Sequence, residues 1–220
     1  MISSLFFPAD VSWYFSEEKY DGSILSENER ELAKTYGTKR FTDFCTGRFC
    51  MRQATASLGF TGDILIGERG MPLLPGNITA SLSHSKKISG AIAGHKDNYL
   101  SLGIDIETCG RVKQDMWYLL FTENELLFLN DKNEEQIQFY ATAFFSLKEA
   151  FYKMQYPLTC IYLDFPEVEV VVTNDQYYVK PLRHVAGLFT EGRLFPGQVI
   201  RYKEQVVTYL TLPAGAVAAN

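Results

Sequence analysis

The sequence has few of the side chains that bind transition metals, with only four cysteines and three histidines among 220 residues. The cysteines, Cys45, Cys50, Cys109 and Cys160, show no CxxC spacing, so no zinc site is expected. We interpret them as small buried apolar residues or unreactive surface residues in a reducing compartment, and therefore expect the protein in the cytoplasm.

Long apolar runs and an excess of basic residues are also missing. Polar residues interrupt every apolar run before it reaches the roughly 20 residues that span a bilayer. The N-terminal stretch Leu5-Phe6-Phe7-Pro8 is too short for a signal peptide and has no basic flank. With 21 Lys+Arg against 26 Asp+Glu, the net charge of -5 argues against a protein that coats nucleic acid. We expect neither membrane nor nucleic acid as a partner, although local basic clusters can bind a phosphorylated small molecule.

No low-complexity segment or short-period repeat is present, which excludes solenoids, propellers and collagen-like arrays. The remaining patterns predict a helix-rich segment followed by strands, twice in succession. Helices are expected over 26–35, 41–58, 122–130 and 134–154, and strands over 63–67, 79–83, 88–93, 99–107, 161–165, 167–173, 176–180, 185–190, 198–202 and 205–211. No linker rich in Gly, Ser or Pro separates these parts, so we expect two closely packed halves, 1–105 and 106–220.

The segment Gly103 to Glu107 reads GIDIE and ends a predicted strand. Strand side chains alternate between faces, so Asp105 and Glu107 point the same way while Ile104 and Ile106 enter the core. Two like charges on one face repel unless a cation lies between them, and oxygen ligands with room for phosphate suit Mg²⁺. The alternative is a solvated strand end with two exposed acids.

A second charged pair lies in the longest predicted helix. Glu149 and Lys153 are four residues apart, so they share one helical face in the order that pairs best. A surface salt bridge is one interpretation. The aromatic residues around the pair favour burial, and a buried charged pair usually has a task.

Two further segments are rich in groups that bind phosphate. Ser81 to Lys87 (SLSHSKK) runs from a strand into a polar turn, where His84 is either a phosphate donor or a turn residue. It is no protease signature, because adjacent strand residues point to opposite faces. Arg40, Arg48 and Arg52 fall along one helical side, which is typical either of a solvated face or of a phosphate site.

In this order and at these separations, the segments resemble the 4′-phosphopantetheinyl transferases of the Sfp type, most closely the variety that activates enterobactin-like synthetases. The resemblance covers about residues 39–153 through the patterns KRxx[DE]FxxGRxCxR, RxxPxxP, SHS, GIDIE and FSxKEAxxK. Leu74, Phe145 and Ala150 depart from the Trp, Trp and Ser that are frequent in the family, and none of these departures removes a charged group.

The resemblance implies a pseudo-twofold pair of similar α+β halves in a single chain, with the active site in the cleft between them. It implies transfer of the phosphopantetheine arm of coenzyme A to a serine of an acyl or peptidyl carrier protein, dependent on Mg²⁺ or Mn²⁺, with release of 3′,5′-ADP. Fatty acid and secondary metabolism both use such carriers, and the protein is expected to be a monomer. The competing interpretations are a metal-dependent phosphohydrolase of a small nucleotide or a coenzyme A-like substrate, and a non-catalytic nucleotide-binding protein.

The resemblance also implies a role for each site residue. Asp105, Glu107 and Glu149 would hold the metal, and Glu149 is the candidate acceptor of the serine proton. Lys153 would contact the leaving phosphate and supply its proton, while Lys148 would help to position the pyrophosphate. The contacts to the phosphates and adenosine of coenzyme A are expected from Arg40, Arg48, Arg69, Ser83 and His84.

Overall fold

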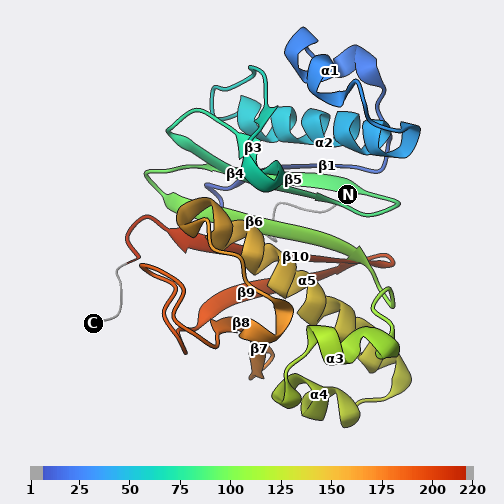
Figure 1. The fold of residues 1–220 in the computed structure, drawn as a ribbon, viewed down its shortest axis with the longest axis vertical. Helices are drawn as coiled ribbons and strands as arrows, with labels where there is room; N and C mark the ends of the chain where they lie inside the picture. Colours follow the sequence, from blue (N-terminus) through green and yellow to red (C-terminus); the bar gives the residue numbers. More distant parts are fainter. Residues whose placement is uncertain (1–6, 217–220) are drawn as a thin grey trace.

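The structure, a computed structural model, describes residues 7–216. Its two larger antiparallel sheets each have a long helix packed on them, and a third sheet has only two strands (Figure 1). The five helices are α1 (Glu27–Ala33), α2 (Thr38–Ala56), α3 (Trp117–Leu120), α4 (Glu123–Asn130) and α5 (Glu134–Thr159). The ten strands are β1 (Ser12–Ser16), β2 (Leu65–Ile66), β3 (Pro72–Leu73), β4 (Ile78–His84), β5 (Ser89–His95), β6 (Tyr99–Thr108), β7 (Val168–Thr173), β8 (Gln176–Pro181), β9 (Phe195–Tyr202) and β10 (Gln205–Pro213). The expected α+β class is confirmed.

The N-terminal sheet has the strand order β1-β5-β4, and α2 packs on all three strands. Apolar residues of α2, among them Cys50, Met51 and Ala54, meet Ala91 and Ala93 of β5 in a fully buried cluster. Cys50 is therefore one of the small buried apolar residues that the sequence predicts. Helix α2 covers one face of the sheet and leaves its own other side available for polar groups.

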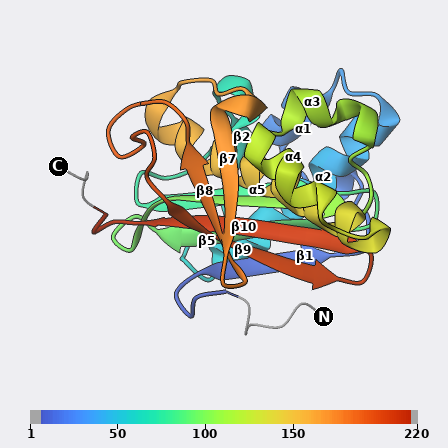
Figure 2. The ribbon, with the colours of Figure 1, turned by 90° about the horizontal axis from the view of Figure 1, so that it is seen from below.

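The C-terminal sheet has the order β6-β10-β9-β8-β7, and α5 packs mainly on β6 and β10. A capping box between Asn133 and Gln136 begins α5, and Cys160 in the left-handed conformation ends it. Figure 2 shows that α2 and α5 lie on the same side of the two sheets. None of the described helices, α5 included, combines the length and the apolar character needed to cross a bilayer.

The two sheets meet where β4 runs beside β6. No backbone ladder joins these strands within the described residues; instead, the hydroxyls of Ser81 and Ser83 accept hydrogen bonds from the backbone N–H groups of Ile104 (3.1 Å) and Ile106 (3.3 Å). The strand pairs of β6 are with β10 throughout. The expected division after residue 105 falls within β6, a strand of the C-terminal sheet.

Several expected elements differ from those observed. Residues 161–165 form a loop and a short 3₁₀ turn instead of a strand, because Asp164 and Glu167 make a capping box around Pro166. Residues 185–190 make a tight loop with a single isolated bridge between Ala186 and Phe189. Strand β1 and helix α3 were not predicted, and α5 runs five residues past the expected end at 154.

Candidate active site

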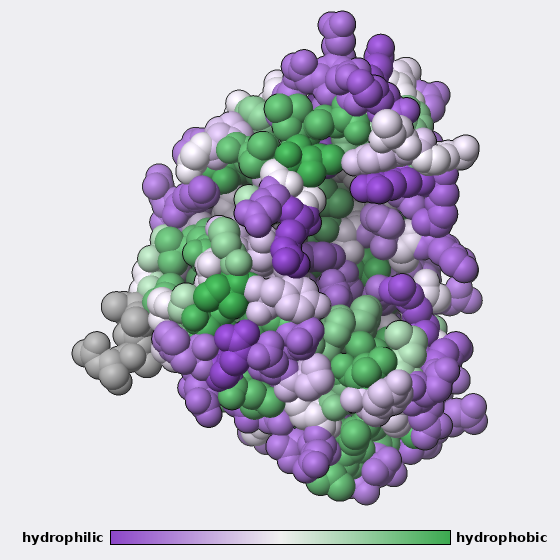
Figure 3. All heavy atoms as spheres, in the orientation of Figure 1, coloured by the Kyte–Doolittle hydropathy of each residue, from purple (hydrophilic) through white to green (hydrophobic). Residues whose placement is uncertain are grey.

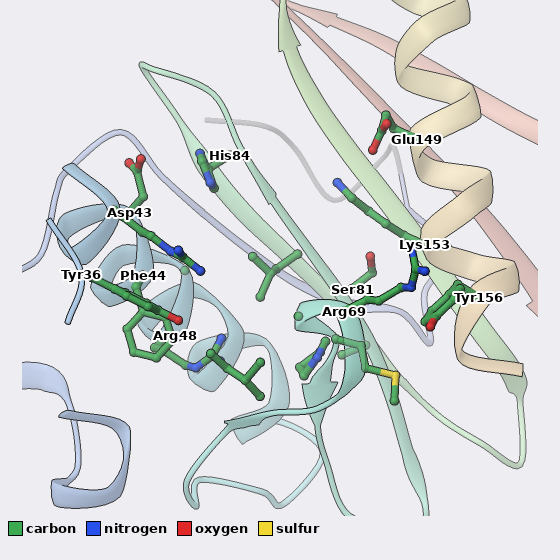
Figure 4. A pocket seen from close by; sticks show the side chains of 18 of the residues that line it. Tyr36, Asp43, Phe44, Arg48, Arg69, Ser81, His84, Glu149, Lys153 and Tyr156 are labelled. Atoms are coloured by element: carbon green, nitrogen blue, oxygen red, sulfur yellow. The ribbon is translucent and has the colours of Figure 1, made fainter. Parts of the chain in front are cut away.

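A cavity of about 1000 Å³ lies between α2 and α5, with β4 as its floor (Figure 4). The space-filling view shows the same face hollowed between the two halves, with hydrophilic residues around the hollow (Figure 3). The charged and histidine side chains that line the cavity are Lys39, Arg40, Asp43, Arg48, Arg69, His84, Glu149 and Lys153. Cations therefore outnumber carboxylates, as an anionic ligand requires.

Asp105 lies beside one end of this cavity, buried on β6 with 4% of its surface exposed. Its Oδ1 accepts hydrogen bonds from the hydroxyl of Ser83 (2.8 Å) and the ammonium of Lys153 (2.7 Å). Its Oδ2 accepts one from the hydroxyl of Ser146 (2.9 Å), which also contacts Thr208. The alternative of a solvated strand end is thus wrong, because Asp105 is held from both halves of the chain.

The two other carboxylates carry perturbed pKa values. Burial, with a contribution from the charge of Asp105, raises the pKa of Glu107 to about 7, although Arg111 forms an ion pair with it. Burial likewise raises the pKa of Glu149; Lys153 opposes this shift and Asp105 adds to it. The main cause of both shifts is burial, which disfavours the charged form of each carboxylate. A cation bound beside these carboxylates would offset that penalty.

Mg²⁺ needs several oxygen ligands close together. Within residues 7–216, no group of three or more His, Cys, Asp or Glu side chains stands ready to hold a metal ion. The donor chemistry nevertheless fits, since Asp105, Glu107 and Glu149 offer only carboxylate oxygens, which are the ligands that Mg²⁺ prefers. In the structure, Lys153 is the cation that pairs with Asp105.

Gly103, the first residue of the GIDIE segment, explains how these groups come together. A Cβ atom at this position would overlap the backbone of Ala150 in α5. The missing side chain lets α5 cross β6 in direct backbone contact. Glu149 and Lys153, on either side of Ala150 along the helix, are thereby carried to the strand that holds Asp105 and Glu107.

The arginines of α2 separate into two kinds. Arg48 is 4% exposed, stacks on the Phe44 ring at 4.3 Å, and its Nε has no hydrogen-bond partner among the described residues. Burial lowers its pKa to about 10, so it stays charged at neutral pH. Arg40 stacks on Tyr36 at 4.0 Å, and both arginines line the cavity. Arg52 instead donates to Glu29 (2.6 Å) outside the cavity, where it anchors α1.

Of the other residues expected to contact the ligand, two line the cavity and Ser83 does not. His84 lines the cavity, as does Arg69, whose left-handed backbone (φ 50°) aims its guanidinium at Tyr156 (5.7 Å) and Tyr162 (5.3 Å). Ser83 does not line the cavity, because its buried hydroxyl is occupied by Asp105 and Lys153. In this structure, Ser83 therefore binds Asp105 and Lys153.

Lys148 does not line this cavity either. Its side chain points away from this cavity, and the ammonium donates to Glu125 at 2.7 Å. The pyrophosphate contact expected of Lys148 therefore has no geometric support.

Sequence reasoning missed several residues of the site. Tyr152 and Tyr156 line the cavity and follow Glu149 by three and seven residues, a spacing that places them on its helical face. Asp43 follows Lys39 by four residues in α2 and forms an ion pair with it (2.7 Å). Ser146 lies inside the FSxKEAxxK pattern, but only the fold shows that it holds Asp105.

The fold and the site define an α+β protein with a cation-lined cavity between two halves. The sequence model described as the 4′-phosphopantetheinyl transferase N-terminal domain matches residues 28–94. The model of the 4′-phosphopantetheinyl transferase superfamily matches residues 101–201. The chain is 33% identical over 197 residues to the 4′-phosphopantetheinyl transferase Svp of Streptomyces mobaraensis, covering 86% of this chain and 76% of the relative. The chain therefore belongs to the 4′-phosphopantetheinyl transferase superfamily and is an enzyme of that activity.

Further relatives match over shorter spans. The chain is 33% identical to the 4′-phosphopantetheinyl transferase Npt of Nocardia iowensis, over 64% of this chain and 63% of the relative. It is 30% identical to the 4′-phosphopantetheinyl transferase PptT of Mycobacterium tuberculosis, over 62% and 60%. Among solved structures, a holo-(acyl-carrier-protein) synthase from Bacillus anthracis in complex with CoA (3′,5′-ADP) is 18% identical with a TM-score of 0.39, covering 53% of this chain and 97% of that chain.

Proposed function

We propose that this enzyme transfers the phosphopantetheine arm of coenzyme A to a serine of an acyl or peptidyl carrier protein and releases 3′,5′-ADP. The observation that carries the proposal is Arg48, a buried guanidinium that faces the cavity with an unpaired Nε. Among the described residues, Glu29 acts on Arg48 only at longer range and no carboxylate forms an ion pair with it, so a buried guanidinium here gains from an anionic ligand. The phosphates of coenzyme A are ligands of the required charge.

The distribution of cations along the cavity supports an elongated ligand with phosphates in two places. Arg48 of α2 and His84 of β4 lie on one side (Figure 4). Together with Arg40, which lines the cavity from the same helix as Arg48, they would contact the 3′-phosphate. Lys153 lies across the cavity on α5, where it would contact the pyrophosphate. The aromatic side chains Tyr36, Phe44, Tyr152 and Tyr156 provide flat apolar surface between these charges.

Asp105, Glu107 and Glu149 would hold Mg²⁺, which when bound neutralises the pyrophosphate and stabilises the charge that develops on the leaving group. The chain's own residues would move the protons. Glu149 lies in the cavity wall, and its raised pKa suits a carboxylate that accepts the serine proton. Lys153 would exchange its contact with Asp105 for the leaving phosphate and donate a proton there.

We assign the enzyme to the Sfp type, in which one chain supplies both halves of the site. Residues of α2 and β4 from the first half and of α5 from the second line one cavity, so a single chain contains the complete candidate site and is proposed to act as a monomer. The enterobactin-like variety is favoured by the motifs between residues 39 and 153 alone.

Intact-mass measurement of carrier proteins tests this proposal. The enzyme is incubated with coenzyme A, Mg²⁺ and each of a panel of acyl and peptidyl carriers, with the Ser→Ala carrier as the control. A gain of one phosphopantetheine on the serine-bearing carrier, with equimolar 3′,5′-ADP, is expected. Release of phosphate without a mass gain would instead identify a phosphohydrolase, and binding of coenzyme A without turnover a non-catalytic protein.

A further inference from the structure

Lys148 is a buried cation for which the proposed reaction has no use. Its side chain is 2% exposed, and the ammonium donates to Glu125 Oε2 (2.7 Å), to the carbonyl of Leu120 (2.8 Å) and to the carbonyl of Phe165 (3.0 Å). An ammonium has three donors, and these three contacts use all of them. No donor remains for a ligand.

Its partner Glu125 is equally committed. Glu125 is 1% exposed, and besides Lys148 its carboxylate accepts from the backbone N–H groups of Thr122 (2.7 Å) and Val170 (2.7 Å). The pair therefore ties α5 to the end of α3, the start of α4, the turn before β7 and β7 itself. A buried pair adds little stability over apolar residues, but it restricts how the segments can be arranged.

The Lys148–Glu125 pair holds α5, the helix that carries the candidate catalytic residues Glu149 and Lys153. Successive residues of an α-helix point about 100° apart around its axis. With Lys148 held against α3, α4 and β7, and Ala150 held against Gly103, the residue between them is directed into the cavity. That residue is Glu149, which forms part of the cavity wall.

We propose that Lys148 and Glu125 form a positioning pair that fixes the rotation of α5 and thereby holds the carboxylate of Glu149 toward the cavity. Lys148 acts through Glu149 and does not touch coenzyme A. The inference rests on the proposed function, because it takes Glu149 as part of the transfer chemistry. If Lys148 contacted a phosphate, its loss would weaken coenzyme A binding. If Lys148 acts through Glu149, its loss lowers kcat and leaves binding unchanged.

The first test separates binding from turnover. Lys148→Met keeps an apolar side chain as far as Cε and removes the ammonium. We expect kcat to fall about tenfold or more, while the Kd of coenzyme A from calorimetry and its KM stay within about twofold. Lys180→Met is the control, since it breaks another ion pair of the same sheet (Glu169, 2.7 Å) that does not involve α5, and kcat should be retained.

Loss of the fold is a separate possibility, because Lys148→Met leaves Glu125 buried without its cation. Glu125→Gln/Lys148→Met removes both charges and keeps an oxygen for the N–H of Val170. Thermal unfolding and circular dichroism establish that this variant is folded. We expect the same loss of kcat with unchanged coenzyme A affinity.

The second test asks whether Lys148 acts through Glu149. If it does, Lys148→Met should lower kcat much less in a Glu149→Asp background than in the wild type, because the carboxylate is already displaced. A purely structural lysine would give losses that multiply. Multiplying losses, unchanged kcat, or a rise of about tenfold in the Kd of coenzyme A in a folded Lys148→Met variant would each overturn the inference. These outcomes refute only the inference when the wild-type enzyme modifies a carrier protein. A wild-type enzyme that modifies no carrier would refute the proposed function as well.

Discussion

Glu107→Gln should stabilise the metal-free protein above pH 7 while it abolishes transfer. The pKa of Glu107 is raised from its ordinary 4.5 to about 7 by burial and by Asp105, so the folded protein binds this proton more tightly than the unfolded chain does. The stabilisation from the bound proton is complete below about pH 4.5 and is lost as the pH rises through about 7.

The structure sets the size of this effect. At about 1.4 kcal/mol per pH unit, the raised pKa corresponds to about 3 kcal/mol of unfolding free energy lost between pH 4.5 and pH 8. Glutamine keeps the side-chain volume without the charge, so the variant should not lose this stability. For a chain of 220 residues, this free-energy difference makes the Tm of Glu107→Gln higher than that of the wild type by roughly 6 to 12 °C at pH 8.

The assay is thermal unfolding in a chelator at pH 5 and pH 8. Wild type and Glu107→Gln should differ little at pH 5 and clearly at pH 8, and added Mg²⁺ should raise the Tm of the wild type at pH 8 but not that of the variant. Glu204→Gln is the control, because this exposed carboxylate has a pKa lowered by Lys87 and its loss should bring no gain at pH 8. A Glu107→Gln variant no more stable than the wild type at pH 8 would refute the reasoning.

Three other perturbations have distinct expected outcomes. Arg48→Met should weaken coenzyme A binding about tenfold or more in calorimetry, whereas Arg52→Met should lower the Tm and leave the affinity of the folded protein unchanged; equal affinities for both would contradict the assignment of Arg48. His84→Ala should weaken coenzyme A more than dephospho-coenzyme A, and an equal loss for both ligands would make His84 structural. Gly103→Ala should lower the unfolding free energy by about 3 kcal/mol or more in denaturant titrations, because α5 must move away from β6, whereas Gly76→Ala meets no atom within 4 Å and should be tolerated.

The strongest elements could be predicted because local pattern decides them. Strand β6 and helix α4 lie within one residue of their expected bounds at both ends, since alternating apolar residues in one and a capping box in the other mark them. Strand β1 escaped prediction because its sequence SWYFS has no polar alternation, and only pairing with β5 makes it a strand.

The sequence predicted which residue types line the cavity, but not which side chains point into it. The spacing of Arg48 and Arg52 places both on one side of α2, yet contact with Glu29 of α1 draws Arg52 away from the cavity. Likewise, Lys148 and Glu149 are neighbours in one motif, and the partner that turns Lys148 into the core is Glu125, more than twenty residues earlier. Such long-range contacts leave no trace in the local pattern of a single sequence.

The most direct test of the central claim is a crystal structure of the enzyme with coenzyme A and Mg²⁺. The account predicts the 3′-phosphate within hydrogen-bond distance of Arg48 and His84, and the pyrophosphate beside Lys153, whose ammonium has left Asp105. It also predicts the metal among Asp105, Glu107 and Glu149. Coenzyme A bound outside the cavity between α2 and α5, or an Arg48 without a phosphate contact in the complex, would contradict it.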